Sequence, residues 1–64
     1  MEIYLIHTDH EIIDLITLDK QLWVNRLNEL AKPDGELLSG DWAEVWKDNK
    51  VFYHVYRLSD IKLS

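Results

Sequence analysis

Three histidines and a nearby aspartate are the residues of this chain whose side chains could bind a metal ion. His7, Asp9 and His10 lie together in the run His-Thr-Asp-His, and His54 is the remaining histidine. Imidazole nitrogen and carboxylate oxygen are ligands for zinc and related divalent ions. The spacing matches no established metal motif, however, and polar residues are common in exposed turns. We therefore interpret the His7–His10 segment as a solvated turn and predict no metal and no cofactor.

His54 is the second candidate for chemistry because it lies between aromatic residues in a run typical of a strand. A general base needs a substrate pocket and an acid that orients it, and the sequence around His54 indicates neither. A chain of 64 residues also has little material to enclose a ligand pocket, which typically measures roughly 300 to 1,000 Å³. We therefore expect a packed histidine and a protein without enzymatic activity.

The balance of charge argues against nucleic acid as a partner. Twelve acidic residues against seven basic ones give a formal net charge of −5. Much of the affinity of proteins for nucleic acid comes from Lys and Arg that neutralise phosphates. The basic residues here occur singly among acidic ones, so we expect no direct binding to nucleic acid or to an anionic membrane. The acidity could instead steer the chain toward a basic partner.

The chain has no cysteine, which is compatible with a reducing cytosol. Its first residues, Met-Glu-Ile-Tyr-Leu-Ile, do not resemble a signal peptide, and no apolar stretch approaches the about 20 residues that span a bilayer. We expect a complete, soluble, cytoplasmic protein with a single domain over residues 1–64. A domain of this length has a small core, and such domains often need a staple or an oligomeric partner.

Two apolar runs near the N-terminus predict a β-hairpin. Residues 2–7 and 11–17 are rich in β-branched residues, and the polar pair Thr8-Asp9 lies between them. A two-residue loop at this pair fixes the register of the two strands. The predicted facing pairs are Leu5 with Ile12 and Tyr4 with Ile13.

Residues 19–32 predict an amphipathic helix, because their apolar positions repeat with a period of about 3.6. Thr17 or Asp19 can cap its N-terminus, and Pro33 ends it. The apolar stripe consists of Trp23, Leu27, Leu30 and Ala31.

Residues 42–58 predict a second hairpin with Asp48-Asn49 at its tip, since both residue types tolerate a positive φ. The predicted facing pairs are Trp46 with Val51, Glu44 with Tyr53, and Trp42 with Val55. The tail that follows is either a frayed end or a short turn that places Ile61 or Leu63 inward.

The order strand, strand, helix, strand, strand predicts an α+β fold. We expect a small two-layer ββαββ domain, in which an antiparallel sheet carries the helix on one face. The order of the strands within the sheet stays open, because a helical crossover between hairpins permits more than one arrangement.

One helix covers one face of such a sheet, so the second face must meet solvent or another molecule. In the first hairpin, the predicted register places Ile3, Leu5, Ile12 and Ile16 on one side and Tyr4, Ile6, Ile13 and Leu15 on the other. In the second hairpin, we predict a partner-binding surface of Trp42, Glu44, Trp46, Val51, Tyr53 and Val55. Aromatic residues are enriched at the centres of interfaces. The alternative is an ordinary small protein with several half-exposed aromatic residues.

Two functions are compatible with this surface. The first is a small acidic protein-interaction module of the regulator or inhibitor type, which binds a protein partner through the aromatic face. The analogy with antitoxin-like and phage-encoded partner proteins rests on size and charge alone. The second is a homodimer or larger oligomer whose sheets pack face to face, with a small-ligand or metal role at the seam or at the His7–His10 turn.

Overall fold

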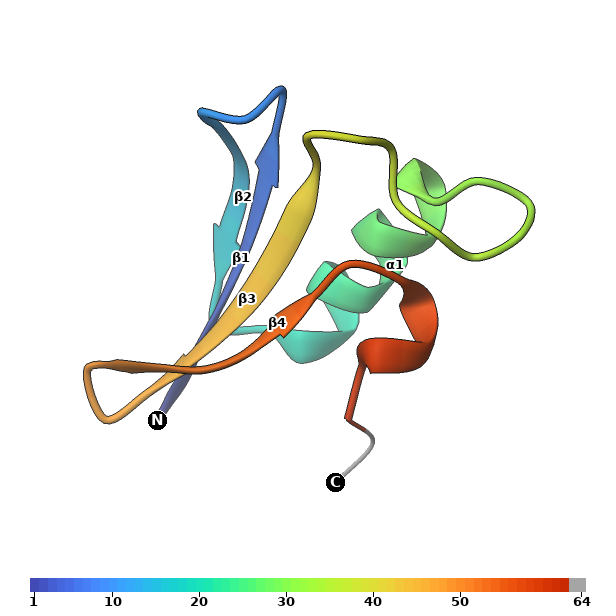
Figure 1. The fold of residues 1–64 in the computed structure, drawn as a ribbon. Coiled ribbons are helices and arrows are strands. Elements are labelled where there is room, and N and C mark those ends of the chain that lie inside the picture. The colour runs from blue at the N-terminus through green and yellow to red at the C-terminus, as the bar shows by residue number, and fades with distance from the viewer. Residues whose placement is uncertain (63–64) are drawn as a thin grey trace.

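The computed structural model describes residues 1–62 and has the predicted α+β fold. The two hairpins lie side by side in one sheet, and the helix packs behind it (Figure 1). The elements in chain order are β1 (Glu2–Thr8), β2 (Ile12–Thr17), α1 (Lys20–Leu30), β3 (Trp42–Lys47), β4 (Lys50–Val55) and a short 3-10 helix, η1 (Leu58–Asp60).

The strand order in the sheet is β2-β1-β3-β4, and every neighbouring pair is antiparallel. The first strand of each hairpin is therefore central, and β1 pairs directly with β3. The second strands, β2 and β4, are the two edges. This order brings residues 2–7 beside residues 42–47.

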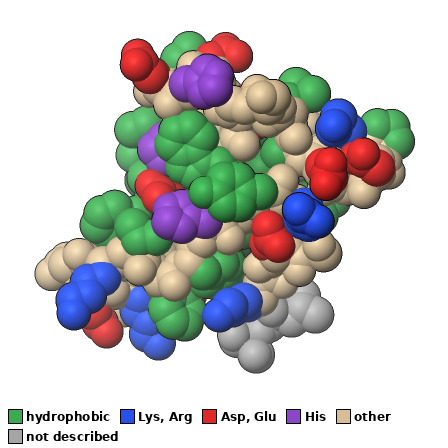
Figure 2. Space-filling model, viewed as in Figure 1, with side chains coloured by type: hydrophobic (Ala, Val, Ile, Leu, Met, Phe, Trp, Pro, Cys, Tyr) green, Lys and Arg blue, Asp and Glu red, His purple; other side chains and the backbone are tan. Residues whose placement is uncertain are grey.

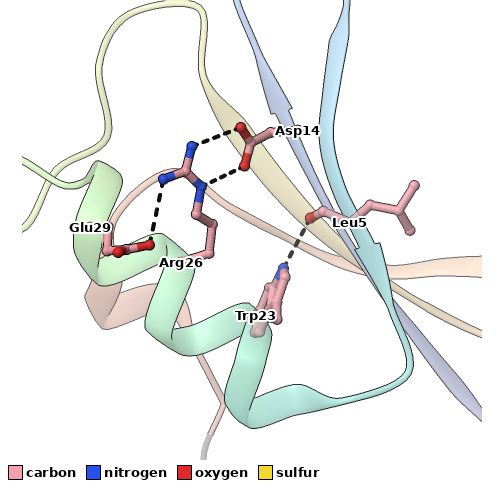
Figure 3. Close-up of polar contacts among 5 residues, drawn as sticks. All are labelled: Leu5, Asp14, Trp23, Arg26 and Glu29. Carbon is pink, nitrogen blue, oxygen red and sulfur yellow. Dashed lines mark hydrogen bonds and ion pairs between the residues drawn. The ribbon is translucent and has the colours of Figure 1, made fainter.

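Helix α1 begins at its predicted cap and ends two residues before its predicted end. The side chain of Asp19 accepts hydrogen bonds from the backbone amides of Gln21 and Leu22. Ala31 is already extended, as is expected shortly before a proline. Trp23 is fully buried, and its indole N–H donates to the carbonyl oxygen of Leu5 at 3.0 Å (Figure 3).

The core lies between the sheet and α1, with the loop after the helix closing it at one end. Leu37 is buried there, and Leu58 and Ile61 pack against the core from the chain's last turn. The inward position of Ile61 agrees with one of the two arrangements considered for the tail, while Leu63 lies outside the described residues. The buried residues are Tyr4, Ile6, Trp23, Leu27, Leu37, Ala43, Val45 and Val55.

The first hairpin has a longer turn and a different register from the prediction. Thr8 extends β1, so the turn comprises residues 9–11, in which Asp9 and His10 have φ values of 51° and 69°. Asp14 is an extra residue in β2, a β-bulge. The observed pairs are Tyr4 with Thr17, Leu5 with Ile16, Ile6 with Leu15, His7 with Ile13 and Thr8 with Ile12, so the pairs predicted for Leu5 and Tyr4 are wrong.

The bulge in β2 has a partner on the helix. Arg26 donates two hydrogen bonds to the carboxylate of Asp14, at 2.8 and 2.9 Å, and also approaches Glu29 (Figure 3). Hydrogen bonding from Arg26 holds the pKa of Asp14 below its usual value. The extra residue thus ties the edge strand to α1. It also reverses the faces predicted for the residues before it, so Ile13 and not Ile12 shares a face with Leu5.

A second bulge, in β4, shifts the register of the other hairpin away from the predicted one. The tip is Asp48-Asn49 as predicted, with φ values of 53° and 66°, and Trp46 faces Val51 as predicted. Phe52 is then the extra residue, so Val45 and not Glu44 faces Tyr53, and Ala43 and not Trp42 faces Val55. Val55 is consequently buried and Tyr53 packs against the core.

Candidate functional site

The face of the sheet away from α1 presents ten side chains, which we call the open face. None of them is buried. Cross-strand neighbours share a face, so the registers arrange the ten in three rows across the sheet. The rows are Ile3, Trp46 and Val51; Ile16, Leu5, Glu44 and His54; and Ile13, His7 and Trp42.

Apolar side chains dominate the open face. Ile13 and Ile16 are 51% and 57% exposed, and Ile3 and Val51 are also exposed. Figure 2 shows hydrophobic and histidine side chains gathered over the strands, with lysine and arginine below and to the right of them. A contiguous apolar patch of this kind is uncommon on a monomer that has no partner.

A polar cluster occupies the middle of the open face. The Oε1 atom of Glu44 lies 2.9 Å from Nε2 of His7, and its Oε2 atom lies 3.4 Å from Nε2 of His54. The side chains of Glu44 and His7 are only 12% and 15% exposed, whereas that of His54 is 45% exposed. One carboxylate from β3 therefore bridges a histidine from β1 and a histidine from β4.

Aromatic rings flank this cluster on two sides. The imidazole of His7 stacks on the ring of Trp42, with centroids 4.4 Å apart and planes 13° apart. The imidazole of His54 stacks less closely on Tyr56, at 6.0 Å and 18°. The imidazole of His7 is thus held by an aromatic ring as well as by the carboxylate, whereas the more exposed imidazole of His54 has looser contacts with both.

Trp46 lies at one end of the open face, beside a hollow. A cavity of about 360 Å³ is lined by Met1, Ile3, Trp46, Asp48 and Asn49. The indole nitrogen of Trp46 is buried and has no hydrogen-bond partner among residues 1–62. An unsatisfied buried donor costs about 1–3 kcal/mol. A hydrogen-bond acceptor placed beside the indole nitrogen of Trp46 would therefore be stabilising.

The structure brings together four of the six residues predicted as a partner-binding surface. Trp42, Glu44, Trp46 and Val51 are all on the open face. The prediction that Tyr53 and Val55 share this face is wrong, because the bulge at Phe52 turns both toward the core.

Short-range sequence patterns did not indicate that His7 and His54 converge on one acid. No orienting acid was predicted for His54, yet Glu44 lies beside it, and His7 approaches the same carboxylate from a strand 37 residues away in sequence. The strand order together with the bulge at Phe52 reveals this cluster, because only the observed registers make Glu44 the cross-strand neighbour of Leu5 on one side and of His54 on the other.

The His7–His10 turn is packed against the loop before β3. The backbone amide of His10 donates to the carbonyl oxygen of Gly40, and that of Asp9 donates to the carboxylate of Asp41. The imidazole of His10 lies directly over Gly40. The turn therefore separates its two histidines, since His7 faces Glu44 on the open face. Within residues 1–62 no group of three metal-ligating side chains could hold a metal ion.

Within residues 1–62, no helix is both long enough and apolar enough to cross a membrane. No protein-family model matches the chain, and comparisons with curated proteins and with solved structures found no match either.

Proposed function

We propose that this protein is a small protein-interaction module that binds a protein partner through the open face. The observation that carries the proposal is the apolar character of a sheet face that neither α1 nor η1 covers. A sheet face that meets only water usually carries polar residues in alternation with the buried ones. Here the outward positions of β1 and β2 are occupied instead by Ile3, Leu5, Ile13 and Ile16.

The two tryptophans of the open face support this assignment. Trp and Tyr are the residues most often found at the energetic centres of interfaces. Trp42 and Trp46 are half-buried on β3, a central strand, where a flat partner surface can reach them. The hollow beside Trp46 can accept an apolar side chain of the partner.

The overall charge favours a basic partner surface. With a net charge of −5, the chain would be steered toward positive charge. A regulator or inhibitor of a basic cytoplasmic protein is the role that agrees best with small size, acidity and an apolar face.

Self-association is a second candidate, and one observation favours it specifically. Edge strand β2 has no lysine, arginine or proline, the residues that commonly protect sheet edges from pairing. The strand carries exposed hydrophobic side chains, and so does the segment that follows it. The exposed residues are Ile12, Ile13 and Ile16 in β2, and Leu18 and Leu22 after it. The metal role considered for such an oligomer gains no support from the His7–His10 turn, whose histidines are directed to different neighbours.

The docking proposal is tested by affinity capture with matched variants. Trp46→Glu and Val51→Glu place a charge on the open face at two facing positions. Leu38→Glu is the control, because Leu38 is 53% exposed in the loop before β3 and lies off that face. We expect one protein to be captured by the native chain and by the control, and to be lost with both face variants.

Each variant must first give the dispersed amide spectrum of the folded chain. Capture that survives both open-face substitutions would contradict the proposal. Equal loss of capture with Leu38→Glu would show that the loss is not specific to the open face, and would also contradict the proposal.

A further inference from the structure

Glu44 has one oxygen that is well bonded and one that is available. Its Oε1 atom is held by His7 at 2.9 Å. Among residues 1–62, its Oε2 atom has only the 3.4 Å contact with His54, which is longer than the 2.7–3.2 Å of an ordinary N–H···O hydrogen bond. Because His54 is an exposed residue on an edge strand, its ring can move aside without disturbing the core.

The Glu44 carboxylate has no permanent positive charge beside it. Among residues 1–62, no lysine or arginine nitrogen lies within ion-pair distance of it, and its only charged-group neighbours are the two histidines. A neutral imidazole donates a hydrogen bond but supplies no positive charge. A carboxylate that is largely withdrawn from water is stabilised when a cation completes its environment.

The rings around Glu44 favour a planar cation. Trp42 with His7, and Tyr56 with His54, present stacked aromatic pairs on either side of the carboxylate. A guanidinium group can donate to a carboxylate while it stacks on an aromatic face, whereas an ammonium group is a compact point charge. The site therefore fits arginine better than lysine.

A second copy of this chain is poorly suited to supply that arginine. Both arginines of the chain face acids within it: Arg26 is bound to Asp14 by two hydrogen bonds, and Arg57 lies 3.9 Å from Glu36. Pairing two open faces would also bring together copies of a chain whose net charge is −5. The cation is therefore expected from a different protein.

We propose that the open face recognises an arginine side chain of its partner, which pairs with Oε2 of Glu44 while apolar residues on either side of that arginine pack on the outer rows. This inference rests on the proposed docking function and specifies its partner. The row with Trp46 and the row with Trp42 lie on opposite sides of Glu44, so the arginine is central and its apolar neighbours flank it.

The test is a selection of random nine-residue peptides displayed against the immobilised protein. We expect the enriched peptides to contain an arginine between apolar residues. One such peptide is then synthesised in two further forms, with citrulline, the neutral isostere of arginine, or with lysine in place of the arginine. Replacing arginine by citrulline should weaken binding roughly 10- to 100-fold, the usual effect of losing a hydrogen bond to a charged group.

Glu44→Gln should make the arginine and citrulline peptides bind equally, whereas Glu29→Gln, which removes an exposed carboxylate on α1, should leave the difference intact. Because the peptide substitutions leave the protein unchanged, they remain informative even if Glu44→Gln lowers stability.

The outcomes separate this inference from the docking proposal. The selected peptides could show no enrichment of arginine and yet lose their binding with Trp46→Glu. That result would overturn the inference and leave the docking proposal intact. An arginine peptide that binds the Glu44→Gln variant as tightly as the native chain would overturn the inference as well. Failure to select any peptide sensitive to Trp46→Glu would overturn both.

Discussion

Asp14 has a specific role because a bulge turns it toward the helix. Its ion pair with Arg26 lowers the pKa of the carboxyl in the folded protein, so the pair stabilises the fold above the unfolded-state pKa of Asp, about 3.9. This contribution is lost as the pH falls through the lower, folded-state pKa.

We expect Asp14→Asn to lower the free energy of unfolding at pH 7 by about 1 kcal/mol, the upper range for partly exposed ion pairs. Urea denaturation between pH 7 and pH 2 measures this loss, and the variant should lose less stability than the native protein below about pH 4. Glu29→Gln is the control, since Glu29 lies 3.5 Å from Arg26 and is exposed. Identical acid dependence for Asp14→Asn and the native chain would contradict the assignment.

Gly40 illustrates how a glycine can be required for two separate reasons. Its φ of 92° disfavours any other residue, and a Cβ atom there would lie 2.9 Å from Nε2 of His10. Gly35 has a similar φ of 88° but open space around it, so a substitution there introduces the backbone strain without the steric contact.

Gly35→Ala should cost about 1–2 kcal/mol from backbone strain alone. Gly40→Ala should cost about 1 kcal/mol more, because the methyl group displaces the ring of His10. In a His10→Ala background this additional cost should disappear. Chemical denaturation of the four variants measures these differences, and equal costs for the two glycine substitutions would disprove a close contact at His10.

Among the elements, the tip of the second hairpin was predictable in position but is not optimal in sequence. Asp48 and Asn49 both have a positive φ, as in a type I′ turn, and that turn prefers glycine at its second central position. Asn49→Gly should therefore raise the free energy of unfolding by about 0.5 kcal/mol, whereas Asn49→Ala should lower it. Thermal and urea unfolding compare the two, and destabilisation by Asn49→Gly would show that the asparagine side chain makes a stabilising contact.

The sequence predicted the four strands and the helix α1, but not the faces of the edge strands, and it left the last turn open. Apolar period and capping were sufficient for α1, and the residue types at the tip were sufficient for the β3–β4 turn. The bulges at Asp14 and Phe52 were not predictable, because the residue pattern of each strand also fits a regular pairing without an extra residue. Each bulge moved residues to the opposite face, which is why Tyr53 and Val55 were misassigned.

The part of the candidate site that was predictable lies along β3 and at Val51, which faces Trp46 from β4. Trp42, Glu44 and Trp46 alternate on β3, and alternation alone placed them on one face. His7 joins them through the pairing of β1 with β3, and His54 joins them through the bulge at Phe52. Short-range patterns encode neither, so a cluster built across three strands is visible only once both are known.

For the molecule as a whole, the β2 edge is the feature most relevant to self-association, because it has no lysine, arginine or proline and its protection consists of the bulge at Asp14. If two copies pair there, sedimentation velocity should show a coefficient that rises with protein concentration, and Ile12→Lys should suppress the rise. Ile12 faces Thr8 and is not part of the open face, so this substitution should leave partner docking intact. Trp46→Glu should instead abolish partner docking and leave the concentration-dependent rise intact. A constant sedimentation coefficient for the native chain would exclude pairing through β2.

The positions of the three tryptophans make the chain its own optical reporter. Trp23 is enclosed in the core and hydrogen-bonded to Leu5, whereas Trp42 and Trp46 are half-exposed on the open face. Emission from Trp23 should shift to longer wavelength when the protein unfolds and stay unchanged when a partner binds. Emission from the other two should shift to shorter wavelength on binding. Two single-tryptophan forms, one retaining Trp23 and one retaining Trp46, would thus report unfolding and association separately, without any attached label.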